Sequence, residues 1–212
     1  MYRLDAETLE PVGTPVNLAQ QTVAVSAGLD GRFAIAVDRT GRFAVVDLVD
    51  GEVLHEGGLG LEPSSVELSP DGQRAVVVGI DAEVGVLDVE NGEWVSPPVR
   101  APRGSAAFAS YTADGERVVA GGRNGVASLW DGRTGQLLAS MVVDTTGVVR
   151  PTILEDGYTA MLTTPDGAAY AWDTRPESWI ATACAIAGRN LTEDEWRDAF
   201  GDRPYRPSCP EP

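Results

Sequence analysis

A repeat of roughly 42 residues is the feature that most limits the folds open to this chain. Asp-Gly turns recur at spacings of 41 (30 to 71), 43 (71 to 114) and 42 (114 to 156) residues, beginning at Asp30, Asp71, Asp114 and Asp156. A second series of aspartates ends strands in the same phase, at Asp47, Asp88, Asp131 and Asp173. Self-similarity at such a period indicates stacked copies of one supersecondary unit.

Each period has the pattern of four short strands joined by tight turns. In the second unit the predicted strands end at Ser69 and Val78, and then occupy residues 84–89 and 93–95. The Asp-Gly and Asn-Gly pairs between them supply the positive φ angles that tight hairpins need. Four-stranded antiparallel units of about 40 residues, arranged radially, are the blades of a β-propeller.

Two units resemble WD repeats: ADGERVVAGGRNGVASLWDGRTGQLL and EDGYTAMLTTPDGAAYAWD. The resemblance covers residues 1 to about 176, although the Gly-His pair typical of that family is absent and Val46 and Leu87 replace the Trp in the first two units. The expected fold class is all-β, a partial β-propeller of WD-repeat type. It has about four blades plus half a blade and ends in a short α-helical C-terminal cap.

The blade boundaries follow from the repeat. Residues 1–16 are expected to form a half blade, residues 21–58, 63–99 and 105–143 three complete blades, and residues 148–173 three strands of a fourth. A closed four-bladed ring is possible, since propellers have about 4 to 8 blades. A C-terminal piece of a longer propeller is favoured, because the half blade has no inner strands. Protein partners or the remaining blades are then expected to cover its open edges.

Residues 177–212 predict a helical cap. Apolar side chains at helical spacing precede Gly188, and Thr192 with Glu195 has the spacing of a capping box at the start of a second helix. The proposed cap residues are Trp179, Cys184, Thr192, Glu195, Trp196, Tyr205 and Cys209. The cap is expected to cover the last blade, so that its deletion destabilises that blade.

The tail also resembles the C-terminal extension that closes many bacterial WD-repeat regions. The resemblance rests on Trp179, Cys184, the AGRNLT segment at residues 187–192, Glu195-Trp196, and Pro204-Tyr205 followed by Cys209. It implies a parent protein with an upstream STAND-type NTPase, sometimes preceded by a DNA-binding transcriptional activation domain, in which the propeller is the sensor. No GxxxxGK[ST] phosphate-binding loop occurs in the 212 residues themselves.

The two cysteines favour reduced thiols over a disulfide, which is kept as the alternative. Cys184 and Cys209 lie 25 residues apart (184 to 209), outside any CxxC motif, and a cytosolic compartment keeps thiols reduced. Catalysis by Cys184 needs a neighbouring histidine, and the only histidine, His55, belongs to an outer strand. Cys184→Ser is therefore expected to leave binding intact.

The charge excludes several classes of partner. The net charge is −16, and all 16 basic residues are arginines, a composition typical of high-GC bacterial genomes. Such a chain is not expected to bind nucleic acid or anionic membranes. It has no signal segment and no apolar run of the roughly 20 residues that span a bilayer, so a cytoplasmic protein is expected. No cofactor or metal is expected, because the turn carboxylates Asp81, Glu83 and Asp166 are too few for a calcium loop.

Interaction is the function that remains. Asp47, Asp88, Asp131 and Asp173 are predicted to be structural turn residues. Arg100, Arg103 and Arg123 are candidate partner-binding residues in rim loops, since arginine is enriched at binding hot spots. The leading hypothesis is a non-enzymatic protein-interaction or ligand-sensing module, the C-terminal sensor of a larger bacterial signalling or regulatory protein. The alternatives are a self-contained scaffold whose open blade edges oligomerise and, less favoured, a propeller hydrolase.

Overall fold

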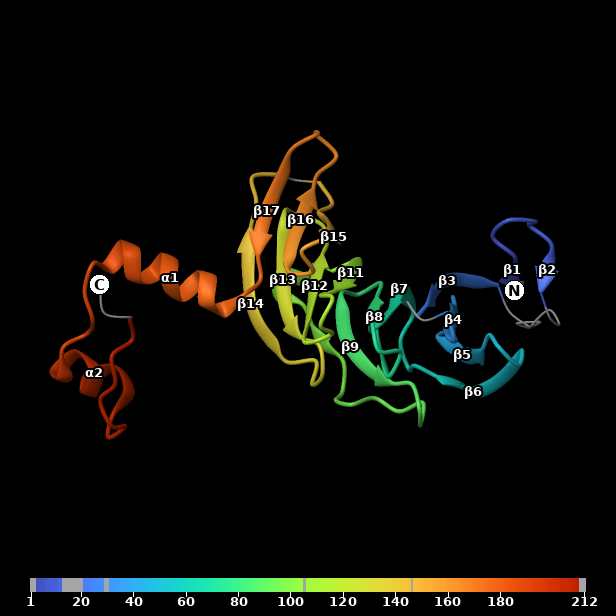
Figure 1. Ribbon diagram of the computed structural model, residues 1–212, viewed down its shortest axis with the longest axis horizontal. Coiled ribbons are helices and arrows are strands. Elements are labelled where there is room, and N and C mark those ends of the chain that lie inside the picture. The colour runs from blue at the N-terminus through green and yellow to red at the C-terminus, as the bar shows by residue number, and fades with distance from the viewer. Residues whose placement is uncertain (1–2, 13–20, 29–30, 105, 146, 210–212) are drawn as a thin grey trace. The chain divides into compact units, whose positions relative to one another are not determined.

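The computed structural model describes residues 3–12, 21–28, 31–104, 106–145 and 147–209. The chain divides into two compact units, Met1–Trp172 and Asp173–Pro212, and each is considered separately (Figure 1). The first consists of strands and is called the propeller unit; the second contains two helices and is called the tail unit. The predicted turn at Asp30 and residues 13–16 of the predicted half blade lie outside the described residues.

The propeller unit contains a series of antiparallel sheets. β1 (Arg3–Leu4) and β2 (Pro11–Val12) pair in a two-stranded sheet. Blade 1 consists of β3 (Thr22–Ala27), β4 (Phe33–Asp38), β5 (Arg42–Asp47) and β6 (Glu52–Gly58). Blade 2 consists of β7 (Pro63–Leu68), β8 (Arg74–Gly79), β9 (Glu83–Asp88) and β10 (Val99–Arg100).

The next two sheets repeat this order. Blade 3 consists of β11 (Phe108–Tyr111), β12 (Arg117–Gly121), β13 (Val126–Asp131) and β14 (Leu137–Val142). Blade 4 has three strands, β15 (Arg150–Ile153), β16 (Thr159–Thr163) and β17 (Ala169–Asp173). A short 3₁₀ helix, η1 (Pro102–Gly104), lies between blades 2 and 3. In each blade consecutive strands pair in chain order.

Glycines make the repeated hairpin turns possible. Gly72, Gly115 and Gly157 occupy equivalent turn positions and have φ angles of 69°, 69° and 77°. These angles lie in the left-handed region that side chains with a Cβ rarely adopt. The Asp-Gly pairs of the sequence therefore set the strand lengths.

Neighbouring blades pack through the two faces of their central strands. Successive side chains of a strand point to opposite faces, so Val77 packs toward blade 1 and Val76 toward blade 3. Ile35 and Val45 belong to the first of these clusters, and Trp130 to the second. This packing explains why the central strands are apolar throughout rather than alternating.

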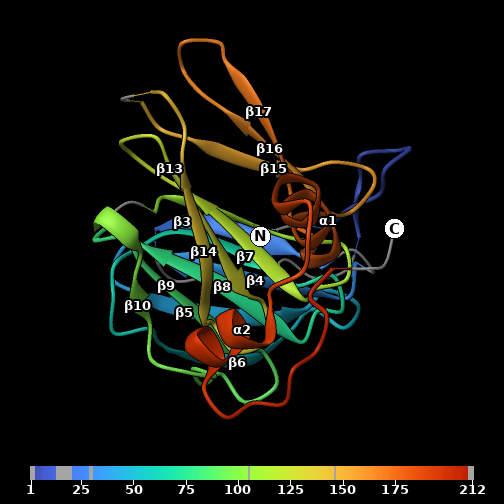
Figure 2. The same ribbon diagram turned by 90° about the vertical axis from the view of Figure 1, so that its left-hand side faces the viewer.

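The blades form a row in the order of the sequence. The innermost strands lie side by side, β3 with β7, β7 with β11 and β11 with β15 (Figure 1). Figure 2 views the same row end-on, so that its blades overlap. In the described part of the chain no comparable contact joins β15 back to β3, so the row does not close into a ring. The predicted fold, a partial β-propeller followed by a short helical segment, is confirmed.

Within the propeller unit, the sheet at the end of the row has a neighbouring blade on one face only. Trp130 of β13 is fully buried, whereas Trp172, at the same repeat position in β17, is partly exposed. The strand β13 is buried along almost its whole length, while β17 has no buried residue. Blade 4 therefore has one neighbouring blade where blades 2 and 3 have two.

The predicted outer strand at residues 93–95 is wrong. The fourth strand of blade 2 is β10, and Trp94 makes only an isolated bridge with Leu87. The indole lies so close to β9 that a Cβ on Gly85 would be 2.7 Å from Trp94 Cζ3, and Trp94 Nε1 donates to the Leu59 carbonyl at 3.1 Å. The tryptophan thus packs across the sheet, and the ladder resumes after Pro98.

The tail unit contains α1 (Pro176–Ala187) and α2 (Glu193–Phe200). Proline at the first helical position starts α1, and Gly188, with a φ of 67°, ends it. Across the described ranges, neither helix has the length and apolar character needed to span a membrane.

Candidate functional site

The turns of the propeller unit form two rims, because the innermost strands all run in the same direction. The acidic rim contains the turns that follow β5, β7, β9, β11, β13 and β15. Its acidic residues are Asp47, Asp50, Asp71, Asp88, Glu90, Asp114, Glu116, Asp131, Glu155 and Asp156. The linker rim, at the other ends of the strands, contains the turns after β4, β8, β12 and β16 and the connections between blades.

The repeat-end aspartates organise their turns through backbone amides. Asp47 Oδ1 accepts from the Val49 amide at 2.8 Å, Asp88 Oδ1 from Glu90 at 2.9 Å, and Asp131 Oδ1 from Thr134 at 2.8 Å. The Val49 amide lowers the pKa of Asp47, against the opposing effect of burial. Because one carboxylate oxygen is used for turn geometry, an asparagine at these positions keeps the acceptor while losing the charge.

Asp173 is held differently, at the start of the tail unit. Arg175 donates to it from both its amide and its guanidinium, with Nη2 at 2.6 Å from Oδ2. The guanidinium hydrogen bonds, with burial opposing them, lower the pKa of Asp173. Trp179 Nε1 donates to the Asp173 carbonyl at 2.5 Å, so Asp173 fixes the entry of the chain into α1.

The three candidate arginines belong to the linker rim. Arg100 ends β10, Arg103 lies in η1, and Arg123 precedes β13; all three are exposed. The Ala101 amide donates to the Ala82 carbonyl at 2.8 Å, which fixes this loop beside the turn after β8. The rim that carries these arginines is therefore opposite the acidic one.

A partly buried carboxylate joins blades 2 and 3. Glu67 of β7 accepts from the Tyr111 amide at 2.9 Å and from the Ser110 hydroxyl at 3.2 Å. Ser26 has the equivalent position in blade 1, and its Oγ accepts from the Leu68 amide at 2.9 Å. The same backbone donor is thus bound by a neutral hydroxyl at one junction and by a carboxyl group at the next. Burial raises the pKa of Glu67, against the effect of its two hydrogen bonds.

We expect Glu67→Gln to stabilise the propeller unit at neutral and alkaline pH. A raised folded-state pKa means that the stability contributed by Glu67 is complete below its unfolded pKa and is lost as the pH rises through the folded one. Glutamine keeps an acceptor for the Tyr111 amide without a charge to desolvate. The melting temperature, followed by circular dichroism of the strands, should rise by about 2–4 °C at pH 8, with a smaller rise at pH 4.

Ser110→Ala provides the matched control. It removes one donor to the Glu67 carboxyl group, so it should lower the melting temperature more at pH 8 than at pH 4. A loss of stability in Glu67→Gln that is larger at pH 8 than at pH 4 would contradict this expectation, because it would show that the ionised carboxylate is favourable at the junction.

Most of the proposed cap residues interact with one another within the tail unit. Thr192 and Glu195 make a reciprocal capping box, with Thr192 N donating to Glu195 Oε2 at 2.8 Å and Glu195 N to Thr192 Oγ1 at 3.2 Å. Arg189 donates to both Glu195 oxygens at 2.7 Å and, with the Thr192 amide, lowers the pKa of Glu195 to about 2. Trp196 packs against Phe200 and Tyr205, with ring centroids 4.4 and 5.8 Å away.

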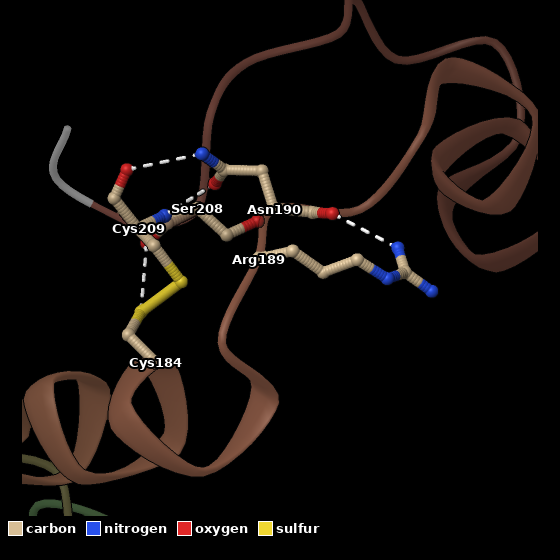
Figure 3. The surroundings of a disulfide bond; sticks show 5 residues. All are labelled: Cys184, Arg189, Asn190, Ser208 and Cys209. Atoms are coloured by element: carbon tan, nitrogen blue, oxygen red, sulfur yellow. Dashed lines mark hydrogen bonds between the residues drawn. A yellow bond between two sulfur atoms is a disulfide. The ribbon is translucent and has the colours of Figure 1, made fainter. Parts of the chain in front are cut away.

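The expectation of reduced thiols is wrong, because Cys184 and Cys209 form a disulfide (Figure 3). Asn190 holds the backbone of Cys209 on both sides: its Oδ1 accepts from Cys209 N at 2.7 Å, and its Nδ2 donates to Cys209 O at 3.4 Å. The bond links the last turn of α1 to the proline-rich end of the chain. The role of residues 177–212 as a cover for blade 4 stays a prediction.

The sequence interpretation missed Glu67 and a second feature, a cavity beside His55. Glu67 had a signal, because the repeat places it in phase with Ser26 and Ser110. Within the described ranges, no group of three or more His, Cys, Asp or Glu side chains has the arrangement of a metal site.

Comparison with solved structures finds β-propellers. The chain is similar to the β-propeller domain of Cps50 (Swd1) from Myceliophteria thermophila, with 18% identity, a TM-score of 0.69, and coverage of 82% of this chain and 59% of that one. For BamB from Moraxella catarrhalis the identity is 20%, the TM-score 0.62, and the coverage 74% and 48%. For Kuenenia stuttgartiensis hydrazine synthase the values are 22%, 0.64, 76% and 48%.

No protein-family model and no curated protein matches the chain. The chain spans between 48% and 59% of the length of these three structures. At 18–22% identity the likeness shows the fold alone, and that fold is the β-propeller.

Proposed function

We propose that this chain is a protein-interaction or ligand-sensing propeller module with no enzymatic activity of its own. The observation that carries the proposal is the end of the propeller unit, where blade 4 has one neighbouring blade and β17 has no buried residue although its equivalent in blade 3 is buried. An uncovered sheet face is a site that another protein surface can occupy. One of the similar structures is named as an enzyme, hydrazine synthase, so the absence of activity is part of the proposal.

The finer proposal is that the module is the C-terminal sensor of a larger bacterial signalling or regulatory protein. Its support is the tail resemblance, the arginine-only composition and the coverage of about half of longer propellers. In that setting the remaining blades cover blade 4, and the rims are left for the sensed partner. The alternative is a scaffold in which a second copy covers the same face.

A cytoplasmic location is part of the same proposal. The cytoplasm is the expectation from the sequence, whereas a disulfide is typical of oxidising compartments. Alkylation of intact cells distinguishes the two placements. Labelled Cys184 and Cys209 would indicate the cytoplasm, and thiols protected until reduction would indicate an oxidising compartment.

Photo-crosslinking in cells tests the interaction role. Amine-reactive reagents suit this chain poorly, because it contains no lysine. A photoreactive phenylalanine analogue at Ile80, which is 56% exposed on the linker rim, should crosslink a recurrent protein partner. The same analogue at Ile186, 83% exposed on α1, is the control.

The arginines of the linker rim give this test its specificity. Arg100→Glu combined with Arg103→Glu should reduce the Ile80 crosslink at least about fivefold if the rim binds the partner through them. Crosslinks from Ile80 that join only copies of this chain would favour the scaffold. Equal crosslinking from Ile80 and Ile186 would contradict a rim-specific partner.

A further inference from the structure

A cavity of about 440 Å³ opens on the acidic rim at the junction of blades 1 and 2. Four separate segments form it: the start of β4, the middle of β6, the turn after β7 and the turn after β9. Its volume lies within the range of about 300–1,000 Å³ that is usual for ligand sites. It lies on the opposite rim from the arginines predicted to bind a partner.

One wall of the cavity is apolar. Phe33, Leu54 and Val89 line it, and Leu54 is 43% exposed although it is a large aliphatic side chain. The guanidinium carbon of Arg32 lies 4.7 Å from the centre of the Phe33 ring. This aromatic ring therefore already stacks against one cation of the chain.

The other wall is negative. Asp71, Asp88 and Glu90 contribute three carboxylates, and Arg74 is the one permanent cation among the lining residues. Arg74 Nη1 lies 4.0 Å from Asp71 Oδ2, and Arg74 is also the cross-strand partner of Asp88, so one cation faces three carboxylates. Asp88 uses Oδ1 for the amides of its own turn, which leaves its charge facing the cavity together with that of Glu90.

An apolar wall beside uncompensated carboxylates suits a ligand with a hydrocarbon stem and a cationic end. Lysine and arginine side chains have this construction. Anions meet repulsion here, both from the cavity wall and from the net charge of −16. Because the cavity is larger than one side chain, neighbouring residues of a peptide also fit.

We propose that this cavity binds a basic side chain, arginine or lysine, from an exposed segment of a partner protein. The proposal rests on the proposed interaction function and adds to it the chemistry of the partner. The negative charge of the acidic rim raises the local concentration of such a segment, and the cavity then selects the side chain.

Fluorescence anisotropy with two labelled peptides and one unlabelled competitor tests this proposal at about 0.15 M salt, where distant charges are screened. The first probe is the acetylated and amidated peptide Gly-Leu-Arg-Leu-Gly. The second replaces the arginine with citrulline, which has the same shape without the charge. Unlabelled butylguanidinium is the competitor that represents a free small cation. We expect the arginine peptide to bind, and the citrulline peptide to bind at least about tenfold more weakly.

Two charge-matched pairs of substitutions locate the site. Asp88→Asn with Glu90→Gln neutralises the cavity wall and keeps the turn acceptor at residue 88. Asp131→Asn with Glu155→Gln makes the same change of charge in the equivalent turn of blade 3 and the exposed turn of blade 4. Affinity for the arginine peptide should fall at least about tenfold in the first pair and change less than about twofold in the second.

Equal losses in the two pairs would overturn the proposal, because they would show diffuse attraction to the acidic rim. Binding of the citrulline peptide as tightly as the arginine peptide would show that charge has no role. Binding of butylguanidinium as tightly as the arginine peptide would show that the cavity takes a free small cation and not a protein side chain. Failure of the arginine peptide to bind, in a protein whose Ile80 position still crosslinks a recurrent partner, would leave the proposed function intact. It would reject only this cavity as the place of contact.

Discussion

Loss of the Cys184–Cys209 bond is expected to unfold the tail unit while the strands of the propeller unit persist. The tail unit has 40 residues (173 to 212), and Trp196 is the only buried hydrophobic side chain among those described. Units of about this size rarely bury enough apolar surface to fold without a covalent or metal crosslink. The disulfide therefore supplies what the small core lacks.

The size of the expected loss of stability follows from the length of the loop that the disulfide closes. Closing a loop with a sequence separation of 25 residues restricts the unfolded chain by about 3–4 kcal/mol. The capping box and the exposed ion pairs contribute about 1 kcal/mol or less each, and each aromatic contact of Trp196 contributes about 1 kcal/mol. Removing the bond thus removes the largest single stabilising contribution to this unit.

The measurement is hydrogen exchange followed by mass spectrometry on Cys184→Ser, Cys209→Ser and the double variant. All three should lose protection in α1 and α2 to the same extent, since each lacks the same bond. Protection of β8, β12 and β13 should stay unchanged, because these strands are buried within the propeller unit. Reduction of the unmodified protein should reproduce the effect.

A loss of partner binding would contradict this structural role of the disulfide. Cys184→Ser is expected to leave partner binding intact, because the structure gives this sulfur a packing and crosslinking role. If this substitution abolished binding while the propeller unit stayed folded, the tail would be part of the binding machinery. A redox role for the cysteine pair would then have to be reconsidered.

The repeat made the propeller predictable because its signals are local. An Asp-Gly turn requires only its own backbone angles, and Gly72 and Gly115 adopt them at equivalent positions. The same holds for Thr192 and Glu195, whose spacing is sufficient to form a capping box. The strand at residues 93–95 was predicted wrongly because the position of Trp94 depends on Gly85 and Leu59, which lie elsewhere in the sequence.

The disulfide and the cavity depend on contacts that no local pattern reveals. Asn190 brings Cys209 to Cys184 by binding its backbone, and nothing in the spacing of the cysteines indicates that contact. The cavity brings Phe33, Leu54 and Asp88 together from two blades, so its charge and apolar wall appear only in three dimensions. Glu67 is an intermediate case, because its position in the repeat can be read from the sequence but its partial burial cannot.

The second large expected effect is self-association of the isolated chain through the end of the propeller unit at blade 4. Blade 4 has a partly exposed Trp172 at the position where Trp130 is fully buried, and it lacks a fourth strand. Uncovered strands and apolar surface of this kind promote association with other chains. The isolated chain is therefore expected to self-associate or to unfold without cooperativity, rather than to remain a stable monomer.

Static light scattering of the isolated 212-residue chain, combined with thermal unfolding, tests the incomplete propeller most directly. The predicted result is heterogeneous association with a broad unfolding transition. A defined dimer whose affinity depends on Trp172 would favour the scaffold, in which a second copy covers blade 4. A compact monomer over a wide concentration range, with a single cooperative transition, would contradict the claim that the propeller is incomplete.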